Sequence, residues 1–524
     1  MDETVDFNEE PEIASGTDVY AIHGADPEVL AYAMAKYSRS SLSMKESLRE
    51  ISAQRAEQFL NTFYFQYGHR SIADLAHIPF AIEELSLLAA ITLVDEQRWD
   101  GQERSTRYQD FRKASWYTPQ MGDSAETYTE AIEALFAAYH QIGGGMLEAL
   151  KVAVPRPETM KPDAWERTLK ARAFDVARYL LPLATNTSLG QIVNARTLET
   201  QVSRLLTSEF AEVRTLGEKL RAAATEPAWN VQHQAMREFV EELAMENEAQ
   251  GREAFELLLR PVASAPTLVK YAARNDYQAE ARNVGRQMVA ELMAGQKIEP
   301  APVVDLLDGD EPLEVELVTS LLYPLCHYSY RQLRSQVAGL RESRRNAMLT
   351  ELTRLRGPHD ELLRGFSAGS TLRFDILMDI GGFRYMHRHR RCTQLLQEFT
   401  DLHGYEEPVC PGQPTLAQAG LVGVYKSAMD AAFLAFEDLK VAGAEEAGES
   451  AQYVLPLGTR CRSMFKMDFA EALYIAELRS GAAGHFSYRR VAWEMYLAVK
   501  KQHPALAGIF RIEDVNVPVD LLKR

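Results

Sequence analysis

The chain carries the stretch Tyr179-Leu-Leu-Pro-Leu-Ala-Thr185 and repeats it, with two substitutions, as Tyr453-Val-Leu-Pro-Leu-Gly-Thr459. Each version follows an alanine-rich helical stretch and precedes a long helical pattern. Self-similarity within one chain indicates repeated structural units. The two stretches therefore suggest that one folding unit occurs twice.

Two shorter matches support the duplication. Lys36-Tyr-Ser-Arg39 resembles Lys270-Tyr-Ala-Ala-Arg274, and Gly68-His-Arg-Ser71 resembles Cys326-His-Tyr-Ser329. All three matches come in the same order in each half. A chance origin explains one short match but not three in register. We interpret the chain as two diverged copies of one α+β unit, joined head to tail.

The copies set the expected domain boundaries. A chain of 524 residues is too long for one ordinary core. The proline-bounded connector Pro261-Val-Ala-Ser-Ala-Pro266 separates the halves. We expect a flexible lead-in over residues 1–16, a first copy over 17–260 and a second copy over 261–524. The second copy has an arginine-rich insertion at 339–363, interpreted as either a lid or a solvated helix.

Each copy is expected to be rich in helix, with one small sheet. The runs 78–82 and 372–377 have the period-2 character of strands. Long amphipathic helices are predicted over 197–223 and 469–499. The glycine run 143–145 is interpreted as a break between helical segments.

Composition excludes several classes of protein. Hydrophobic residues make up 46% and charged residues 25%, which is typical of globular chains. No uncharged apolar stretch reaches the roughly 18 residues of a membrane span, and the acidic N-terminus resembles no secretion signal. Four cysteines without a C-x-x-C pair predict no zinc site and no disulfide framework. A soluble, cytoplasmic protein is expected, and a net charge of −17 disfavours broad nucleic-acid binding.

The run Phe383–Arg391 opposes this acidic balance, because it gathers six basic side chains: Arg384, His387, Arg388, His389, Arg390 and Arg391. Arginine binds phosphate and carboxylate groups through two nitrogens at once. The run is therefore a candidate for holding a phosphate-bearing cofactor. A solvated basic helix face is the alternative.

A second candidate is Gln102–Tyr108, where Ser105 and Arg107 lie two residues apart and can face one ligand from an extended loop. A polar loop is the alternative. Arg178 and Arg479 lie in apolar surroundings, where each needs either an ion-pair partner or a ligand. No glycine-rich phosphate loop, Ser-His-Asp order or metal-binding histidine spacing is present.

Taken in order, these segments resemble the flavin-dependent thymidylate synthase family. The first copy fits the family pattern at five segments: Ser38, Gly68–Ser71, Glu103–Tyr108, Ala177–Pro182 and Asn194–Arg196. It lacks the family's Arg-His-Arg triplet, whose place falls near Asp95–Arg98. The second copy has the triplet as Arg388-His389-Arg390, together with His327, Ser329 and Leu478-Arg479. It lacks the Ser-x-Arg segment, because Glu398-Phe-Thr400 stands there.

The resemblance implies a flavin enzyme that converts deoxyuridine monophosphate (dUMP) to thymidylate. FAD is the implied cofactor, with NADPH and methylenetetrahydrofolate as co-substrates; no metal is implied, and no catalytic residue beyond those that position the ligands. The implied flavin contacts are Ser38, His69, Ser71, Asn194, Arg196, Arg388, His389 and Arg390. The implied nucleotide contacts are Glu103, Ser105, Arg107, Arg178 and Arg479.

Each copy retains the part of the family pattern that the other has lost. We therefore expect composite sites between the copies, and a homodimer that imitates the family's tetramer with fewer working sites. Two alternatives stay open. The chain can be a degenerate member that binds nucleotide or flavin as a scaffold, or a flavin enzyme that modifies another pyrimidine nucleotide.

Overall fold

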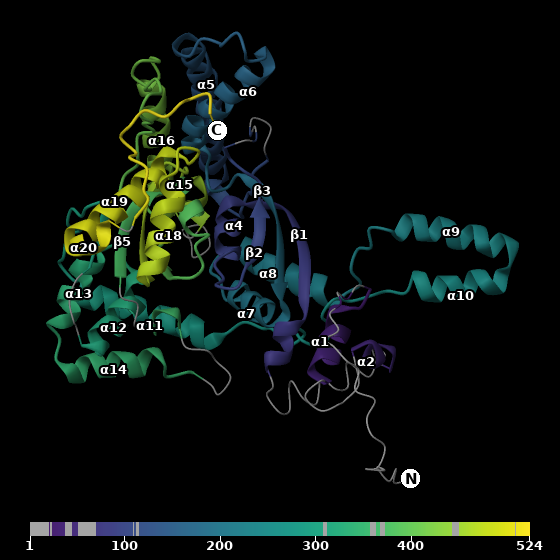
Figure 1. The fold of residues 1–524 in the computed structure, drawn as a ribbon. Coiled ribbons are helices and arrows are strands. Elements are labelled where there is room, and N and C mark those ends of the chain that lie inside the picture. Colours follow the sequence, from purple (N-terminus) through teal and green to yellow (C-terminus); the bar gives the residue numbers. More distant parts are fainter. Residues whose placement is uncertain are drawn as a thin grey trace. The chain divides into compact units, whose positions relative to one another are not determined.

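The computed structural model describes residues 20, 22, 24–36, 44–50, 70–107, 109, 111, 115–307, 312–356, 363–366, 372–442, 450–508 and 510–523 (Figure 1). The expected lead-in over 1–16 lies outside them. The chain forms two compact units. One takes the described residues of 1–76 and 224–268, and the other takes those of 77–223 and 269–524.

The first unit is helical. Its elements are α1 (Pro27–Lys36), α2 (Met44–Glu50), the short helix η2 (Arg70–Leu75), α9 (His233–Glu246) and α10 (Glu248–Leu258). Asn247 separates α9 from α10, and its side chain accepts hydrogen bonds from the Ala249 and Gln250 amides, which starts the second helix. In α1, buried Glu28 accepts hydrogen bonds from the amides of Thr267 and Leu268, at 2.9 and 2.7 Å.

The second unit contains two antiparallel sheets of matching strand order. The first-copy sheet runs β1-β3-β2, with strands His77–Ser86, Asn186–Asn194 and Asp100–Glu103. The second-copy sheet runs β5-β7-β6, with strands Leu372–Asp379, Arg460–Met467 and Thr393–Leu396, and adds β4 (Val304–Leu306) outside β5. Both strand runs expected from the sequence are confirmed, as is the helix-rich α+β fold with a small sheet in each copy.

The helices after the strands repeat too, and each has a side-chain cap. Helix α4 (Leu87–Leu93) follows β1 and is capped by Ser86, whereas α15 (Ile380–Met386) follows β5 and is capped by Asp379. Helix α7 (Ala195–Leu206) follows β3, and α18 (Phe469–Ser480) follows β7; their caps are Asn194 and Asp468. The duplication is therefore present element by element.

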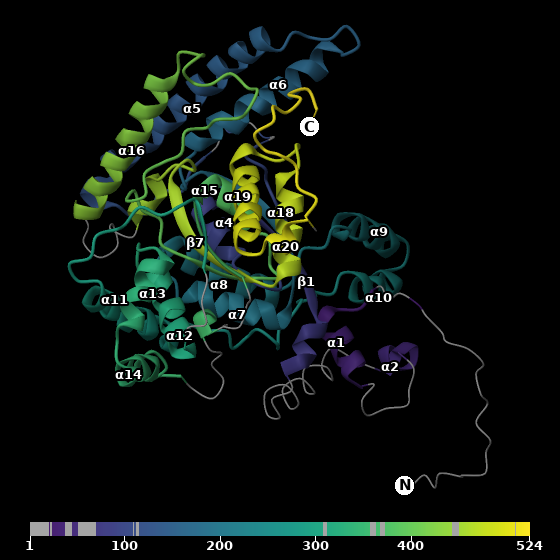
Figure 2. The same cartoon turned by 60° about the vertical axis from the view of Figure 1, so that its left-hand side comes forward.

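The two repeated Tyr-x-Leu-Pro-Leu stretches join the copies directly. Four reciprocal backbone hydrogen bonds of 2.8–2.9 Å link them: Leu183 to Leu455, Ala184 to Tyr453, Leu457 to Leu181 and Gly458 to Tyr179, amide to carbonyl. The equivalent long helices α5 (Ala125–Ala153) and α16 (Val422–Ala442) also pack side by side across the copies (Figures 1 and 2). The two copies therefore pack directly against each other within the second unit.

Three expectations about helices were wrong. The helix predicted over 197–223 is divided into α7 and α8 (Ala211–Thr225), and the turn between them packs Phe210 against Tyr453, with ring centroids 5.9 Å apart. The helix predicted over 469–499 is likewise two helices, α18 and α19 (Phe486–Gln502), separated at Gly481–Gly484. The glycine run 143–145 lies inside α5, where a Cβ on Gly145 would stand 2.8 Å from Leu421. That glycine permits close packing and does not break the helix.

The second copy begins with four helices around their own core: α11 (Asp276–Leu292), α12 (Leu313–Leu322), α13 (Tyr330–Ala338) and α14 (Glu342–Leu352). Helix α14 occupies part of the arginine-rich insertion. One arginine of the helix and one in the turn after it form ion pairs at the surface, Arg344 with Glu291 and Arg354 with Glu280, each at 3.0 Å. The described part of the insertion is therefore a helix that packs on one side and is solvated on its charged face. The remaining elements are η3 (Gly122–Ser124), α6 (Pro162–Ala177), η4 (Arg178–Leu180), η5 (Tyr323–Leu325), η6 (Arg364–Phe366), η7 (Ala451–Val454) and α20 (Pro504–Ala507).

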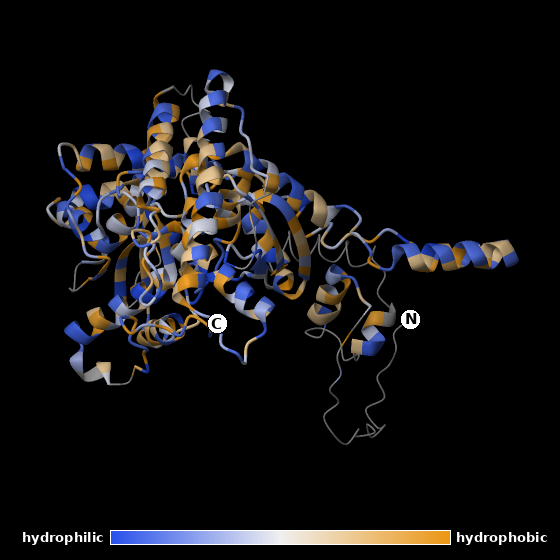
Figure 3. Ribbon diagram, turned by 90° about the horizontal axis from the view of Figure 1, so that it is seen from above, coloured by the Kyte–Doolittle hydropathy of each residue, from blue (hydrophilic) through white to orange (hydrophobic). Residues whose placement is uncertain are grey.

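Hydrophobic residues concentrate on the strands and on the helix faces that cover them (Figure 3). Among the described helices, none is long and apolar enough to cross a bilayer. All four cysteines are buried and unpaired.

We predict that Gly458→Ala destabilises the protein, because a Cβ at this site would stand 2.9 Å from both the Tyr179 ring and the Tyr425 hydroxyl. Overpacking of this kind costs about 1–3 kcal/mol. Urea unfolding should show a lower midpoint for this variant.

Gly423→Ala is the matched control. It lies in α16, where a Cβ meets nothing within 4 Å. Alanine should be neutral or should stabilise the helix by up to about 1 kcal/mol. Equal midpoints for the two variants would contradict the packed junction between the repeated stretches.

Candidate functional site

The second copy presents its basic run on α15 and on the loop that follows. Asp379 caps α15 by accepting a hydrogen bond from the Gly382 amide at 2.6 Å, and Ser487 donates a second hydrogen bond to the same carboxylate. The helix carries Arg384 in its last turn, and the loop to β6 then carries Arg388. The cap and the strand thus hold the run from both ends.

The first copy meets this run through Glu103, the last residue of β2. Both Arg384 and Arg388 donate to its carboxylate, one to each oxygen; the Arg388 contact measures 3.4 Å. The side chains of Glu103 and Arg384 are buried, whereas 29% of the Arg388 side chain is exposed to solvent. One carboxylate of the first copy therefore organises two arginines of the second.

Arg107 belongs to the same loop as Glu103. Its Nε and Nη2 atoms donate to Asp175 at 2.7 and 3.2 Å, and Nη1 donates to the Tyr488 hydroxyl at 3.1 Å. Asp175 comes from α6 of the first copy and Tyr488 from α19 of the second. The carboxylate partner was not expected from the sequence, and it holds the Arg107 guanidinium in one plane.

Arg178 is fully buried at the end of α6. Its guanidinium forms no ion pair, at 4 Å or less, with a carboxylate of the described residues. Nη1 donates to the Thr106 hydroxyl at 3.4 Å, while Nε and Nη2 have no hydrogen-bond partner. The guanidinium lies over the ring of Tyr385, 5.4 Å from its centroid. Buried arginine nitrogens without partners are rare, and they indicate a place where an acceptor from a ligand or water belongs.

Arg479 completes the group from α18. Its Nε donates to His389 Nε2 at 2.8 Å, and its guanidinium lies 5.5 Å from the Tyr488 ring centroid. Burial lowers the pKa of His389, and Arg479 lowers it further. A neutral imidazole that accepts at Nε2 carries its proton on Nδ1, which faces Glu471 at 3.6 Å.

We call the five converging guanidinium groups the arginine cluster: Arg107, Arg178, Arg384, Arg388 and Arg479. Glu103 and Asp175 contact the cluster, and Asp379 acts electrostatically on Arg178. Positive charge is therefore in excess. Two nitrogens of Arg384, Nε and Nη1, also lack hydrogen-bond partners. Unpartnered, planar donors in a positive surrounding fit phosphate groups, so the residues present suit a phosphorylated cofactor or nucleotide.

The cluster brings together seven of the residues named from the sequence: Glu103, Ser105, Arg107, Arg178, Arg388, His389 and Arg479. Arg390 lies beside it, 3.2 Å from Asp100 and over the ring of Trp99. Asn194 caps α7, and Arg196 is half-buried on that helix.

The remaining predicted flavin contacts lie wholly or partly outside the described residues. Ser38 and His69 lie outside the described residues, and only the backbone of Ser71 is described, in η2. In the second copy, Ser329 caps α13 by accepting from the Gln332 amide at 3.2 Å. That serine serves the fold.

Three residues of the site were not singled out in the sequence: Asp175, Tyr385 and Tyr488. Asp175 carries a signal, because it interrupts the apolar run Phe174–Ala177 on a helix and so must be buried with a partner. Tyr385 lies inside the basic run, between charged residues that mark the segment more strongly. No sequence signal marks Tyr488.

The arginine cluster lies at one junction of the two copies, where the Glu103 loop of the first copy meets the basic run of the second. The duplication creates a second junction, where the equivalent segments have exchanged copies, and the matching elements identify its residues. Helices α4 and α15 end, and strands β2 and β6 begin, at equivalent positions, so Asp95-Glu96-Gln97 stands where the second copy has Arg388-His389-Arg390. In the same alignment of the two copies, Thr400 is equivalent to Arg107, and Gln452 is equivalent to Arg178. Leu205 and Ile91 take the places of Arg479 and Arg384. The second junction thus has none of the five cluster arginines.

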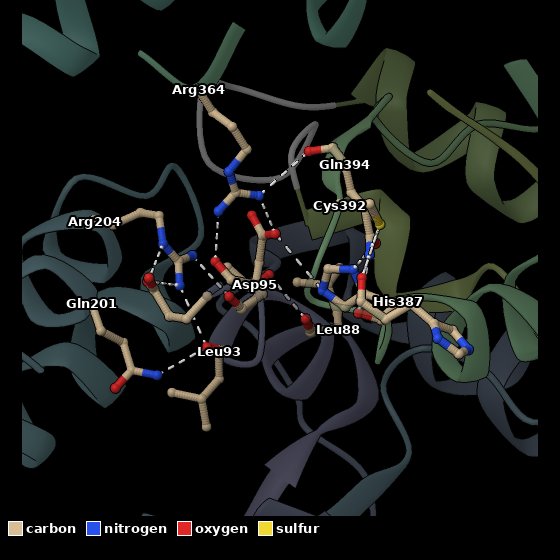
Figure 4. Close-up of polar contacts among 12 residues, drawn as sticks. Leu88, Leu93, Asp95, Gln201, Arg204, Arg364, His387, Cys392 and Gln394 are labelled. Carbon is tan, nitrogen blue, oxygen red and sulfur yellow. Dashed lines mark hydrogen bonds and ion pairs between the residues drawn. The ribbon is translucent and has the colours of Figure 1, made fainter. Parts of the chain in front are cut away.

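An ion-pair network fills part of this second junction (Figure 4). Arg364 binds the Asp95 carboxylate, and His387 lies 3.8 Å from it. Arg204 binds Glu96 at 2.7 Å. Burial alone would raise the pKa of Asp95, but Arg364, His387 and Arg204 together lower it. The charges here satisfy one another within the chain.

Comparison with known proteins agrees with this architecture. The profile of the family described as "Thymidylate synthase complementing protein" matches residues 21–227 and 328–505. A "UPF0159 protein" of Chlamydia muridarum is 26% identical over 94% of this chain and 91% of its own length. A flavin-dependent thymidylate synthase of Clostridium tetani is 28% identical over 177 residues, which cover 33% of this chain and 67% of that protein.

Among solved structures, the flavin-dependent thymidylate synthase of Helicobacter pylori complexed with FAD and dUMP matches at 17% identity and a TM-score of 0.23. It covers 40% of this chain and 93% of that chain. The profile match, by contrast, occurs in both copies and takes in well over half of the residues. The chain therefore belongs to the thymidylate synthase complementing protein family, as a tandem duplication of two diverged copies.

Proposed function

We propose that this chain binds FAD and a pyrimidine nucleotide at the arginine cluster and catalyses the reductive methylation of dUMP. Methylenetetrahydrofolate is the proposed carbon donor and NADPH the proposed reductant. The observation that carries the proposal is the contact of Glu103 with Arg384 and Arg388. It joins the nucleotide-side segment, which the second copy lacks, to the triplet, which the first copy lacks.

The ligand contacts follow from which donors remain available. Arg384 and Arg388, next to the half-exposed loop before β6, are assigned to the flavin phosphates. Arg178, with two unpartnered nitrogens beside the Ser105 loop, is assigned to the nucleotide phosphate. Bound reduced flavin supplies the hydride that the methylation requires. Asp175 and His389 keep Arg107 and Arg479 in place, so little reorganisation is needed when an anion enters.

One composite site per chain follows from the unequal junctions. The second junction has no cluster arginine, and Asp95 stands in place of Arg388. A dimer of chains would then hold two sites. The related C. tetani protein is named a flavin-dependent thymidylate synthase, whereas the relatives that span both copies have names that state no activity.

We expect Arg388→Ala to weaken flavin binding by about 10- to 100-fold, because one charge-assisted contact is worth about 1.5–3 kcal/mol. Fluorescence titration with FAD measures the change. Arg391→Ala is the control, since Arg391 is 68% exposed and pairs with Asp468 at the surface. Similar loss in both variants would mean that general charge, and not this contact, governs binding.

We expect the purified protein, saturated with FAD, to hold one flavin per chain. Flavin absorbance against protein concentration, after removal of free ligand, gives the ratio. A ratio near two would show that the Asp95 junction also binds flavin and would overturn the single-site assignment.

We expect the chain to restore growth of a thymidine-requiring strain without added thymidine, and Arg388→Ala to restore it poorly. Growth supports synthesis of thymidylate. Failure of the wild-type chain, despite normal flavin binding, would instead support a changed role as a nucleotide- or flavin-binding scaffold. Protein that takes up no FAD would reject both.

A further inference from the structure

Tyr385 stands at the centre of the arginine cluster. It lies on α15 directly after Arg384, its ring contacts the Arg178 guanidinium, and its ring centroid lies 5.1 Å from that of Tyr488. Ser105, on the first-copy loop, also favours the ionised form of its phenol. Both copies therefore contribute to its surroundings.

Four guanidinium groups act on this phenol electrostatically, from four different elements. Arg107 comes from the loop after β2 and Arg178 from η4, while Arg384 lies on α15 and Arg479 on α18. Positive charges near a hydroxyl favour its ionised form.

The other acidic groups of the site are already committed. Asp175 accepts two hydrogen bonds from Arg107, and Glu103 is bound to Arg384 and Arg388. Asp379 is a helix cap that Ser487 also contacts. The Tyr488 hydroxyl accepts a hydrogen bond from Arg107. Burial lowers the pKa of His389, whose Nε2 accepts a hydrogen bond from Arg479.

We propose that Tyr385 is the proton-exchanging residue of this site: its phenol ionises more readily than that of a free tyrosine while the arginines face no ligand, and it takes a proton from solvent when a phosphate-bearing ligand binds. This inference rests on the proposed function, in that the ligand is an anion held by the same arginines. Burial alone would raise the pKa of Tyr385, but Arg178, Arg107 and Arg384 lower it below that of a free tyrosine. A bound phosphate counters those charges and makes the phenolate less favourable.

Linkage sets the direction of the pH effect. Since the anionic ligand prefers the protonated phenol, ligand affinity falls as pH rises through the ionisation of Tyr385. Each unit by which the ligand raises this pKa corresponds to as much as a tenfold loss of affinity across the transition. The protonated phenol would then stand beside the bound ligand as a hydroxyl donor.

The test is the ultraviolet titration of tyrosinate in the full chain, as a difference between wild type and Tyr385→Phe. We expect a transition below that of free tyrosine that the variant lacks, and its displacement to higher pH by saturating dUMP. Tyr405→Phe is the matched control. Its hydroxyl donates to Asp430 on another surface, burial and that carboxylate raise its pKa, and its loss should leave the early transition intact. Circular dichroism checks that the variants are folded.

Inorganic phosphate is the second probe, because it separates the phosphate from the base. Displacement by dUMP and phosphate alike places the phosphate beside the phenol and supports the proposal. Identical titrations of wild type and Tyr385→Phe overturn it, as does ligand binding that leaves the transition where it was. If neither probe binds, the proposed function fails, whereas the early transition in ligand-free protein is still measured independently.

Discussion

The contact of one buried carboxylate, Glu103, with two arginines of the other copy is the constraint on which the site depends. Neither partner works alone. Without Glu103, Arg384 would be a buried cation without a counter-charge, and without the arginines Glu103 would be a buried anion. The reciprocal hydrogen bonds between the repeated Tyr-x-Leu-Pro-Leu stretches place the two copies so that this contact forms. Fold and site are thus consequences of the same junction.

Duplication gave the chain two such junctions, and they have diverged in opposite directions. One retains unpartnered guanidinium nitrogens in a positive surrounding. The other has replaced every equivalent arginine and satisfies its charges internally, through Arg364 on Asp95 and Arg204 on Glu96. A single chain can lose half of its sites in this way because the fold needs only the packing of the copies, whereas ligand binding needs specific donors. At Asp95, the surrounding positive charges lower the pKa of the carboxyl and so favour its ionised form without a ligand.

Sequence reasoning predicted the parts that depend on local pattern and residue type. The strands at β1 and β5, the tandem repeat and the opposed segments of the family pattern could all be read from the chain. Partners could not, because they depend on packing. Asp175 is one helical residue among many until α6 brings it to Arg107, and Gly145 resembles a helix breaker until Leu421 is seen against it. Tyr385 could not be identified from the sequence either, because two of the arginines that lower its pKa, Arg107 and Arg178, are distant in sequence.

The central claim is that residues of both copies bind one phosphorylated nucleotide together. A crystal structure of the chain grown with FAD and dUMP tests it most directly. The account predicts the nucleotide phosphate within hydrogen-bond distance of Arg178, with flavin phosphate on Arg384 or Arg388. Ligand bound instead beside Asp95 and Arg364, or within the residues of a single copy, would contradict it.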